Sequence, residues 1–246
     1  MAKGATTELA KPVETAVAVA KPADDVRHGG VSASDLEMPK VLVLQDLSPD
    51  VKARIGLAPG QVINSISKEV LGNLFIPLFP FKNYAKFVKG QIAPEWSTSD
   101  RLDPRVEAGL KWGKDEKGET VNPTVTEFLS FLTLFQDADG AFNMEVPLVL
   151  SFKKTALRSG KQFLTLTQMK GSKPMYAYAY TLNVREKSGN NNTWQEPFVS
   201  VPKDKAQHEL AQATVDQAAA LAARWRPLVT NLNVVDDAAA SEETPF

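Results

Sequence analysis

VPLVLSFKKTALRSGKQFLTLTQMKGSKPMYAYAYTLNVR, residues 146–185, is the stretch that decides the fold. Three segments rich in β-branched and aromatic residues, 146–154, 161–168 and 175–185, alternate with the turn-forming groups 158–160 and 171–174. Such alternation predicts three successive β-strands. Trp194–Val201 has the same character and predicts a fourth, so we expect a β-rich core.

The apolar segments before this stretch are less decisive. Residues 41–44, VLVL, predict a short strand, whereas 125–135, VTEFLSFLTLF, is compatible with a helix or a strand. Residues 71–81 are apolar and aromatic but contain Pro77 and Pro80. Because proline lacks the N–H that a strand ladder needs, this segment predicts an edge strand or a packed extended segment, and not a central strand.

One helix is predicted after the strands, over residues 204–226. Apolar and small residues recur there at helical spacing, Asp204 and Gln207 match a capping box, and Pro227 is expected to end the helix. The predicted fold is therefore β-rich (α+β), an oligonucleotide-binding-like barrel or sheet with a C-terminal helix and disordered termini.

Composition divides the chain into three parts. Residues 1–37 predict a flexible N-terminal arm, 38–228 a single β-rich domain, and 229–246 an acidic disordered tail. The absence of Cys excludes disulfides, thiolate zinc sites and cysteine nucleophiles. No apolar run is long enough for a membrane span and no secretion signal is recognisable, so we expect a cytoplasmic protein with no membrane partner.

The net charge of −1 conceals a division along the chain. Residues 40–205 contain 22 basic and 17 acidic residues, a charge of +5, whereas residues 231–246 contain four acids and no base. Electrostatic binding depends on where charge is displayed and not on its sum. The core can therefore bind a polyanion although the whole chain is slightly negative.

The positive charge is concentrated in residues 151–187, which carry eight basic residues and the single acid Glu186. Cations on neighbouring strands are suited to neutralising a phosphate backbone. The predicted nucleic-acid-binding cations are Lys153, Lys154, Arg158, Lys161, Lys170, Lys173, Arg185 and Lys187. An ordinary solvated charged face is the alternative interpretation.

Aromatic residues accompany these cations. Tyr176, Tyr178 and Tyr180 alternate with small residues, so they share one face of the predicted strand, where rings can stack on unpaired bases. Leu182 continues that face, so a buried tyrosine face is the alternative. Residues 90–124 predict a long structured loop, and its Trp96 and Trp112 are further stacking candidates.

Signatures of catalysis are weak. The two histidines, His28 and His208, have no nucleophile or metal partner near them in sequence, so no catalytic residue, metal or cofactor is predicted. Asp137, Asp139 and Glu145 form the one suggestive carboxylate cluster, although Asp139-Gly140 is more typical of a turn. A metal-dependent nuclease therefore remains a second alternative.

The chain ends in DDAAASEETPF, residues 236–246. A terminal Phe offers an apolar ring and an α-carboxylate on one residue, which a pocket with a basic rim can bind. This ending resembles the acidic tip of bacterial single-stranded-DNA-binding proteins. The resemblance implies that replication or recombination proteins are recruited by Asp236, Asp237, Glu242, Glu243, Pro245 and Phe246. A merely solubilising acidic tail is the alternative.

A second resemblance covers much of the core. KVLVLQDLSPDV at 40–51, EWSTSDR at 95–101 with GLKWG at 109–113, and VPLVLSFKKTALRSGKQFLTL at 146–166 resemble proteins of bacteriophage replication modules. The resemblance implies sequence-nonspecific binding of single-stranded DNA without catalysis, and it is compatible with a homo-oligomer. Cys residues, frequent in that family between Trp96 and Trp112, are missing here, so no metal-binding role is carried over. A phage structural or assembly protein is the first alternative.

Overall fold

The computed structural model describes residues 38–52, 56–88, 94–114, 117–137, 139–169, 172–189 and 192–229. The chain divides into two units, Met1–Ser32 and Ala33–Phe246, and every described residue belongs to the second. The predicted arm, Lys170 and the acidic end of the chain lie outside the described residues.

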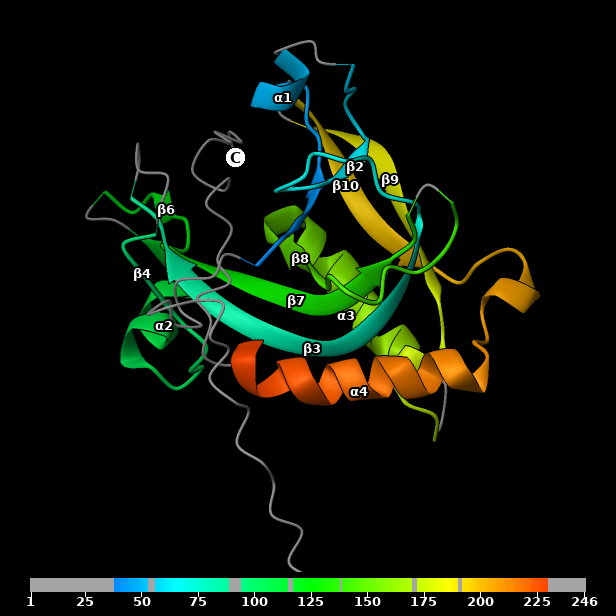
Figure 1. Ribbon diagram of the computed structural model, residues 1–246. Helices are drawn as coiled ribbons and strands as arrows, with labels where there is room; N and C mark the ends of the chain where they lie inside the picture. The colour runs from blue at the N-terminus through cyan, green and yellow to red at the C-terminus, as the bar shows by residue number, and fades with distance from the viewer. Residues whose placement is uncertain are drawn as a thin grey trace, which may run out of the picture. The chain divides into compact units, whose positions relative to one another are not determined.

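An antiparallel sheet of six strands forms the centre of this unit (Figure 1). Its path is β10 (Asn192–Ser200), β9 (Tyr180–Gly189), β3 (Leu74–Lys86), β7 (Val125–Phe135) and β8 (Leu148–Lys153), and β4 (Trp96–Thr98) pairs with β3. β10 and β8, the two ends of this path, do not pair with each other. The fold is therefore β-rich as predicted, and of the two predicted forms the structure shows the sheet and not a closed barrel.

The predicted strand at 41–44 is confirmed as β1 (Val41–Val43), which pairs with β2 (Val62–Asn64). Lys40 forms a parallel bridge with Val149 of β8. At the other end of β1, the Gln45 side chain donates to the Gln195 carbonyl of β10 at 2.9 Å and accepts from its N–H at 2.7 Å. β1 therefore lies between the two outer strands of the large sheet, and the short helix α1 (Pro49–Lys52) follows it.

Two helices pack against opposite faces of the sheet. Alternate residues of a strand point to opposite faces, so neighbouring residues of one strand pack against different helices. The cluster that includes Phe131 and Phe152 packs against α3 (Leu157–Gln168), whose Phe163 ring lies 4.7 Å from Phe131. The neighbouring positions Leu132 and Leu134 belong to a second cluster with α4 (Gln212–Val229). Figure 1 shows α4 running along β3, so the confirmed C-terminal helix forms the outer layer on that side.

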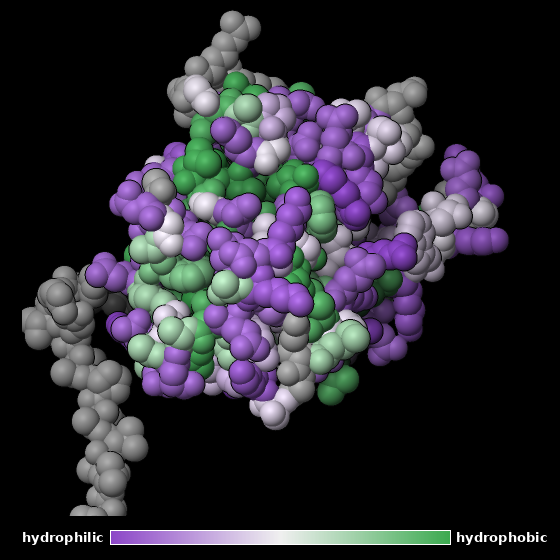
Figure 2. Space-filling model, turned by 90° about the vertical axis from the view of Figure 1, so that its right-hand side faces the viewer, coloured by the Kyte–Doolittle hydropathy of each residue, from purple (hydrophilic) through white to green (hydrophobic). Residues whose placement is uncertain are grey.

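The side of the protein that lies to the right in Figure 1 faces the viewer in Figure 2. Hydrophilic residues cover most of this side, and hydrophobic areas lie between them. The large buried side chains, among them Phe75, Phe128 and Phe135, are instead enclosed in the clusters on the sheet. This distribution is the one expected of a domain whose core is held between a sheet and its covering helices.

The prediction of a strand at 161–168 is wrong, because these residues belong to α3. Ser159, Gly160, Phe163 and Thr167 are its buried residues, and their spacing of one, three and four follows the helical period. A Cβ on Gly160 would lie 2.7 Å from the Cβ of Phe152, so only glycine lets the helix approach β8 this closely. The strands predicted at 146–154 and 194–201 are confirmed as β8 and β10.

The segment 175–185 is only partly a strand. A 3₁₀ turn, η4 (Met175–Ala177), follows Pro174, and β9 starts at Tyr180. The three tyrosines therefore do not share one strand face, which corrects that prediction. The alternative left open at 125–135 is resolved, since these residues form the buried strand β7.

The predicted start of the C-terminal helix is also wrong. Residues 205–207 form a 3₁₀ turn, η5 (Lys205–Gln207), which Asp204 caps by accepting from the N–H of Ala206 at 2.9 Å. Helix α4 then begins at Gln212 and includes Pro227. Proline lies here in the last turn, where it sacrifices one backbone hydrogen bond and does not end the helix.

The prediction that 71–81 would not form a central strand is wrong as well. β3 is central, but it pairs with β9 only at Leu74 and Phe75 and with β4 only over residues 84–86. Pro77 and Pro80 lie between these pairings, where β7 is the one described neighbour, and a bulge falls between Pro77 and Phe79. The prolines are thus tolerated because this part of β3 is locally an edge.

The predicted loop at 90–124 contains short elements. Besides β4 these are α2 (Pro104–Gly109), β5 (Gly113–Lys114) and β6 (Thr120–Val121). Asp103 caps α2 by accepting from the N–H of Arg105 at 2.9 Å, and Val106 is fully buried. The turn predicted at Asp139-Gly140 is confirmed, because Gly140 adopts φ +83°.

Candidate functional site

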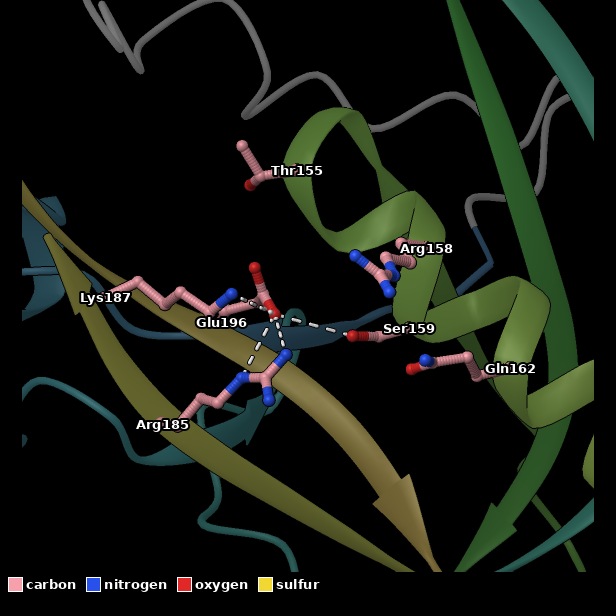
Figure 3. Close-up of a pocket in the computed structure, with 7 residues that line it drawn as sticks. All are labelled: Thr155, Arg158, Ser159, Gln162, Arg185, Lys187 and Glu196. Atoms are coloured by element: carbon pink, nitrogen blue, oxygen red, sulfur yellow. Dashed lines mark hydrogen bonds and ion pairs between the residues drawn. The ribbon is translucent and has the colours of Figure 1, made fainter. Parts of the chain in front are cut away.

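A cavity of about 260 Å³ lies between the first turn of α3 and the hairpin of β9 and β10 (Figure 3). Its lining is almost entirely polar: Thr155, Arg158, Ser159, Gln162, Arg185, Lys187 and Glu196. The residues from α3 form one wall and those from the two strands form the other (Figure 3). Segments about thirty residues apart in the sequence therefore meet at one small polar site.

The strand wall is organised around Glu196, which is only 3% exposed. Arg185 lies directly opposite Glu196 in the hairpin register, and its Nε and Nη2 both donate to Glu196 Oε1. Lys187 Nζ lies 3.6 Å from the same oxygen. Burying a carboxylate is unfavourable unless cations and hydrogen bonds compensate for lost solvation, so these two cations stay close to Glu196.

The helix wall contributes one link and one further cation. The Ser159 hydroxyl donates to Glu196 Oε1 at 3.4 Å and so connects α3 to the hairpin. Arg158 precedes it, is exposed, and extends from α3 toward the strand wall (Figure 3). Within the part of the chain that the structure describes, Arg158 forms no ion pair.

Three cations and one carboxylate therefore surround the cavity and leave a local charge of +2. Arg158 adds a planar fork of N–H donors, which matches the geometry of phosphate and carboxylate oxygens, and Arg185 adds the N–H groups that Glu196 does not bind. The start of α3 contributes the positive end of a helix dipole. Each of these features favours an anion, and phosphate is one of the two anionic groups that arginine forks frequently bind in a bidentate way.

The other predicted cations lie elsewhere. Lys161 faces Glu127 of β7 at 3.9 Å, and Lys173 faces Glu209 at 3.9 Å. Lys153 ends β8, and Lys154 follows it with φ +49°, a left-handed conformation that turns the chain toward α3. The structure thus brings Arg158, Arg185 and Lys187 together at the cavity, whereas Lys153, Lys154, Lys161 and Lys173 do not line it.

The tyrosines are core residues to different degrees. Tyr178 and Tyr180 are 6% and 0% exposed, and burial raises the pKa of Tyr180 to about 12. Tyr176 is half-buried and packs on the cluster beneath α4. The alternative of a buried tyrosine face therefore describes Tyr178 and Tyr180, whose rings cannot reach a base without leaving the core.

The two tryptophans do not line the cavity. Trp96 is half-buried in β4, and the guanidinium of Arg105 lies over its ring at 4.6 Å from the centroid. Trp112, just before β5, is 65% exposed. Of the aromatic residues selected from the sequence, Trp112 presents the largest exposed ring.

Four residues that line the cavity were not predicted as site residues from the sequence: Glu196, Ser159, Thr155 and Gln162. A signal for Glu196 exists, because the sequence Asn190-Asn191 predicts a two-residue hairpin connection, and counting outward from it pairs Arg185 with Glu196, as the register shows. The other three residues were hidden by the incorrect prediction of a strand and turn where α3 lies. No such error affected Arg185, which lies on a strand as predicted; β9 continues beyond the predicted end at 185 and also includes Lys187.

Of the three carboxylates considered for a nuclease, Asp137 performs a structural task. Asp137 Oδ1 accepts from the N–H groups of Asp139 and Ala141, both at 3.0 Å, and so stabilises the turn. Among the described residues, no group of three or more His, Cys, Asp or Glu is arranged to hold a metal ion. In the same residues, no helix has the length and apolar character needed to cross a membrane.

Fold and site together define a class, a β-rich α+β protein with an open six-stranded sheet, helices on both faces and a cationic cavity. Residues 8–223 match the family described as Pam3 phage gp34-like protein, and the chain belongs to this family. The description names a bacteriophage and no activity. Neither a curated protein nor a solved structure matches the chain.

Proposed function

We propose that this chain binds single-stranded DNA without sequence preference in phage DNA replication or recombination, and that it catalyses no reaction. The observation that carries the proposal is the convergence of Arg158, Arg185 and Lys187 on one cavity. Cations held in place by a fold favour phosphate more than scattered mobile ones do, because little side-chain entropy is lost on binding. Lys153 and Lys154 add two basic residues to the chain directly before Thr155 of the cavity.

Bases are proposed to contact exposed aromatic side chains. Trp112 is the strongest candidate, since its ring is 65% exposed and Lys111 and Lys114 are neighbours in sequence. Stacking on an aromatic ring contributes about 1–3 kcal/mol per base and accepts every base. Tyr178 and Tyr180 are not part of this proposal because they belong to the core.

The acidic end is proposed to recruit replication or recombination proteins through Phe246 and the acids before it. This part of the proposal is supported by the sequence alone, because residues 230–246 lie outside the described residues. The ring and α-carboxylate of Phe246 would enter a pocket with a basic rim on the partner.

The test is fluorescence anisotropy with a labelled polythymidine strand and a duplex of the same length over a series of salt concentrations. We expect preference for the single strand and a linear fall of log affinity with log salt. In a double variant, Arg158→Gln with Lys187→Gln, Arg185 remains paired with Glu196. This variant should lower the slope by about 0.7 for each lost phosphate contact.

The matched control is Lys203→Gln with Lys205→Gln, which removes the same charge from exposed positions outside the cavity. Its salt slope should remain that of the unmodified protein. If the cavity variant and this control behave alike, binding is not centred on the cavity. If neither single strand nor duplex binds, the proposal is wrong and a phage structural or assembly protein becomes the better interpretation.

A further inference from the structure

The cavity has two facing walls, which a simple charged surface does not have. Donors approach from two opposite walls, Arg158 and Gln162 from α3 and Arg185 from β9, and Glu196 with Ser159 joins these walls at the base (Figure 3). A nucleic-acid strand that lies across an open protein surface is contacted from one side only. A chemical group that binds between two facing walls enters the cavity through its open side and cannot pass through it.

The charge of the cavity matches one particular group. Its surplus of +2 equals the charge of a phosphomonoester, which carries about −1.5 to −2 at neutral pH and offers three acceptor oxygens. An internal phosphodiester carries a single negative charge. Hydrogen-bond donors on opposite walls of the cavity can therefore bind the oxygens of a terminal phosphate more completely than those of an internal phosphodiester.

The volume points to the same group. About 260 Å³ is below the roughly 300–1,000 Å³ of sites that enclose drug-sized ligands, so the cavity can admit the phosphorylated end of a strand but not several of its nucleotides. We propose that this cavity binds the phosphomonoester end of a nucleic-acid strand, an inference that rests on the proposed function. Glu196 acts as a positioning residue, because it fixes Arg185 and Lys187 without touching the ligand.

The experiment compares thymidine oligomers of about eight nucleotides that differ only at their ends. One has a 5′-phosphate, one a 3′-phosphate, and one hydroxyl groups at both ends, and each competes with a labelled strand for the full chain. We expect one of the phosphorylated oligomers to bind about tenfold more tightly than the hydroxyl form, a difference of about 1.4 kcal/mol.

Two variants locate the effect. Arg158→Gln should remove the tenfold advantage, since it removes the cavity cation that has no carboxylate partner among the described residues. Lys161→Gln is the matched control on the same helix; Lys161 faces Glu127 outside the cavity, so this variant should retain the advantage.

Equal affinity of all three oligomers would overturn the inference and leave the proposed function standing. Equal loss of the advantage in both variants would overturn it as well, because the effect would then not belong to the cavity. Failure of every oligomer to bind would overturn the proposed function together with this inference.

Discussion

Tyr180 is enclosed by aromatic rings at the start of β9. The rings of Phe163 and His208 meet it edge-on with centroids 5.0 and 5.3 Å away. Its hydroxyl is buried and has no hydrogen-bond partner in the described structure. Such a site strongly disfavours the charged tyrosinate, which is why the pKa of Tyr180 rises to about 12.

The Tyr180→Phe variant should reveal this burial through the pH dependence of stability. A tyrosine in the unfolded chain ionises near pH 10, so the contribution of Tyr180 is complete below about pH 10 and is lost as the pH rises through 12. In denaturant titrations, the unmodified protein should lose stability relative to the variant across this window only. Parallel stability curves up to pH 12 would show that Tyr180 ionises normally.

At the scale of elements, α3 shows where sequence patterns mislead. Its sequence, LRSGKQFLTLTQ, contains β-branched threonines and an internal Ser-Gly pair, features typical of strands and turns. The helical spacing of Gly160, Phe163 and Thr167 was also present, but glycine does not look like a core residue. Tertiary packing determines the secondary structure of this segment, because the face of α3 that contains Gly160 packs against Phe152.

Other strands could be predicted from the local sequence alone. Val146–Lys154 and Trp194–Val201 formed strands because their apolar and β-branched residues are bounded by turn signals on both sides. The central position of β3 could not be predicted from the sequence. Proline excludes a central strand only at residues that pair with a strand on each side, and the prolines of β3 pair with β7 alone among the described strands. Three residues of the cavity were among the cations predicted to bind nucleic acid, yet their convergence depended on the position of α3, which the sequence pattern did not reveal.

Replacing Gly160 by Ala tests the close contact of α3 with β8. Alanine favours helices by about 1 kcal/mol over glycine, but its Cβ would overlap Phe152 at 2.7 Å. Overpacking of this kind costs about 1–3 kcal/mol, so the free energy of unfolding should fall. Gly113→Ala is the control, because its nearest neighbour is Val121 Cβ at 3.8 Å. A Gly160→Ala protein more stable than the unmodified one would mean that the helix lies farther from the strand.

For the molecule as a whole, the separation of charge along the chain is the organising feature. The segment from 40 to 205 carries +5, and the last sixteen residues carry −4. Within the folded part, the structure concentrates three cations at one cavity and pairs several others with acids, such as Lys82 with Glu127 at 2.7 Å. The effective positive charge is therefore more local than the sum along the sequence suggests.

Deletion of residues 236–246 tests whether the two charged parts interact. A tethered acidic segment competes with nucleic acid at millimolar effective concentration, so its removal should tighten binding of a polythymidine strand roughly threefold at low salt. The gain should shrink as salt rises, because screening weakens the competition of exposed charges. Anisotropy titrations of both proteins at several salt concentrations measure the difference. Phe246→Ala separates the two tasks of this segment, since it retains all four acids and should leave DNA affinity unchanged while it weakens capture of partner proteins. An unchanged affinity after the deletion would show that the acidic end does not reach the cationic cavity.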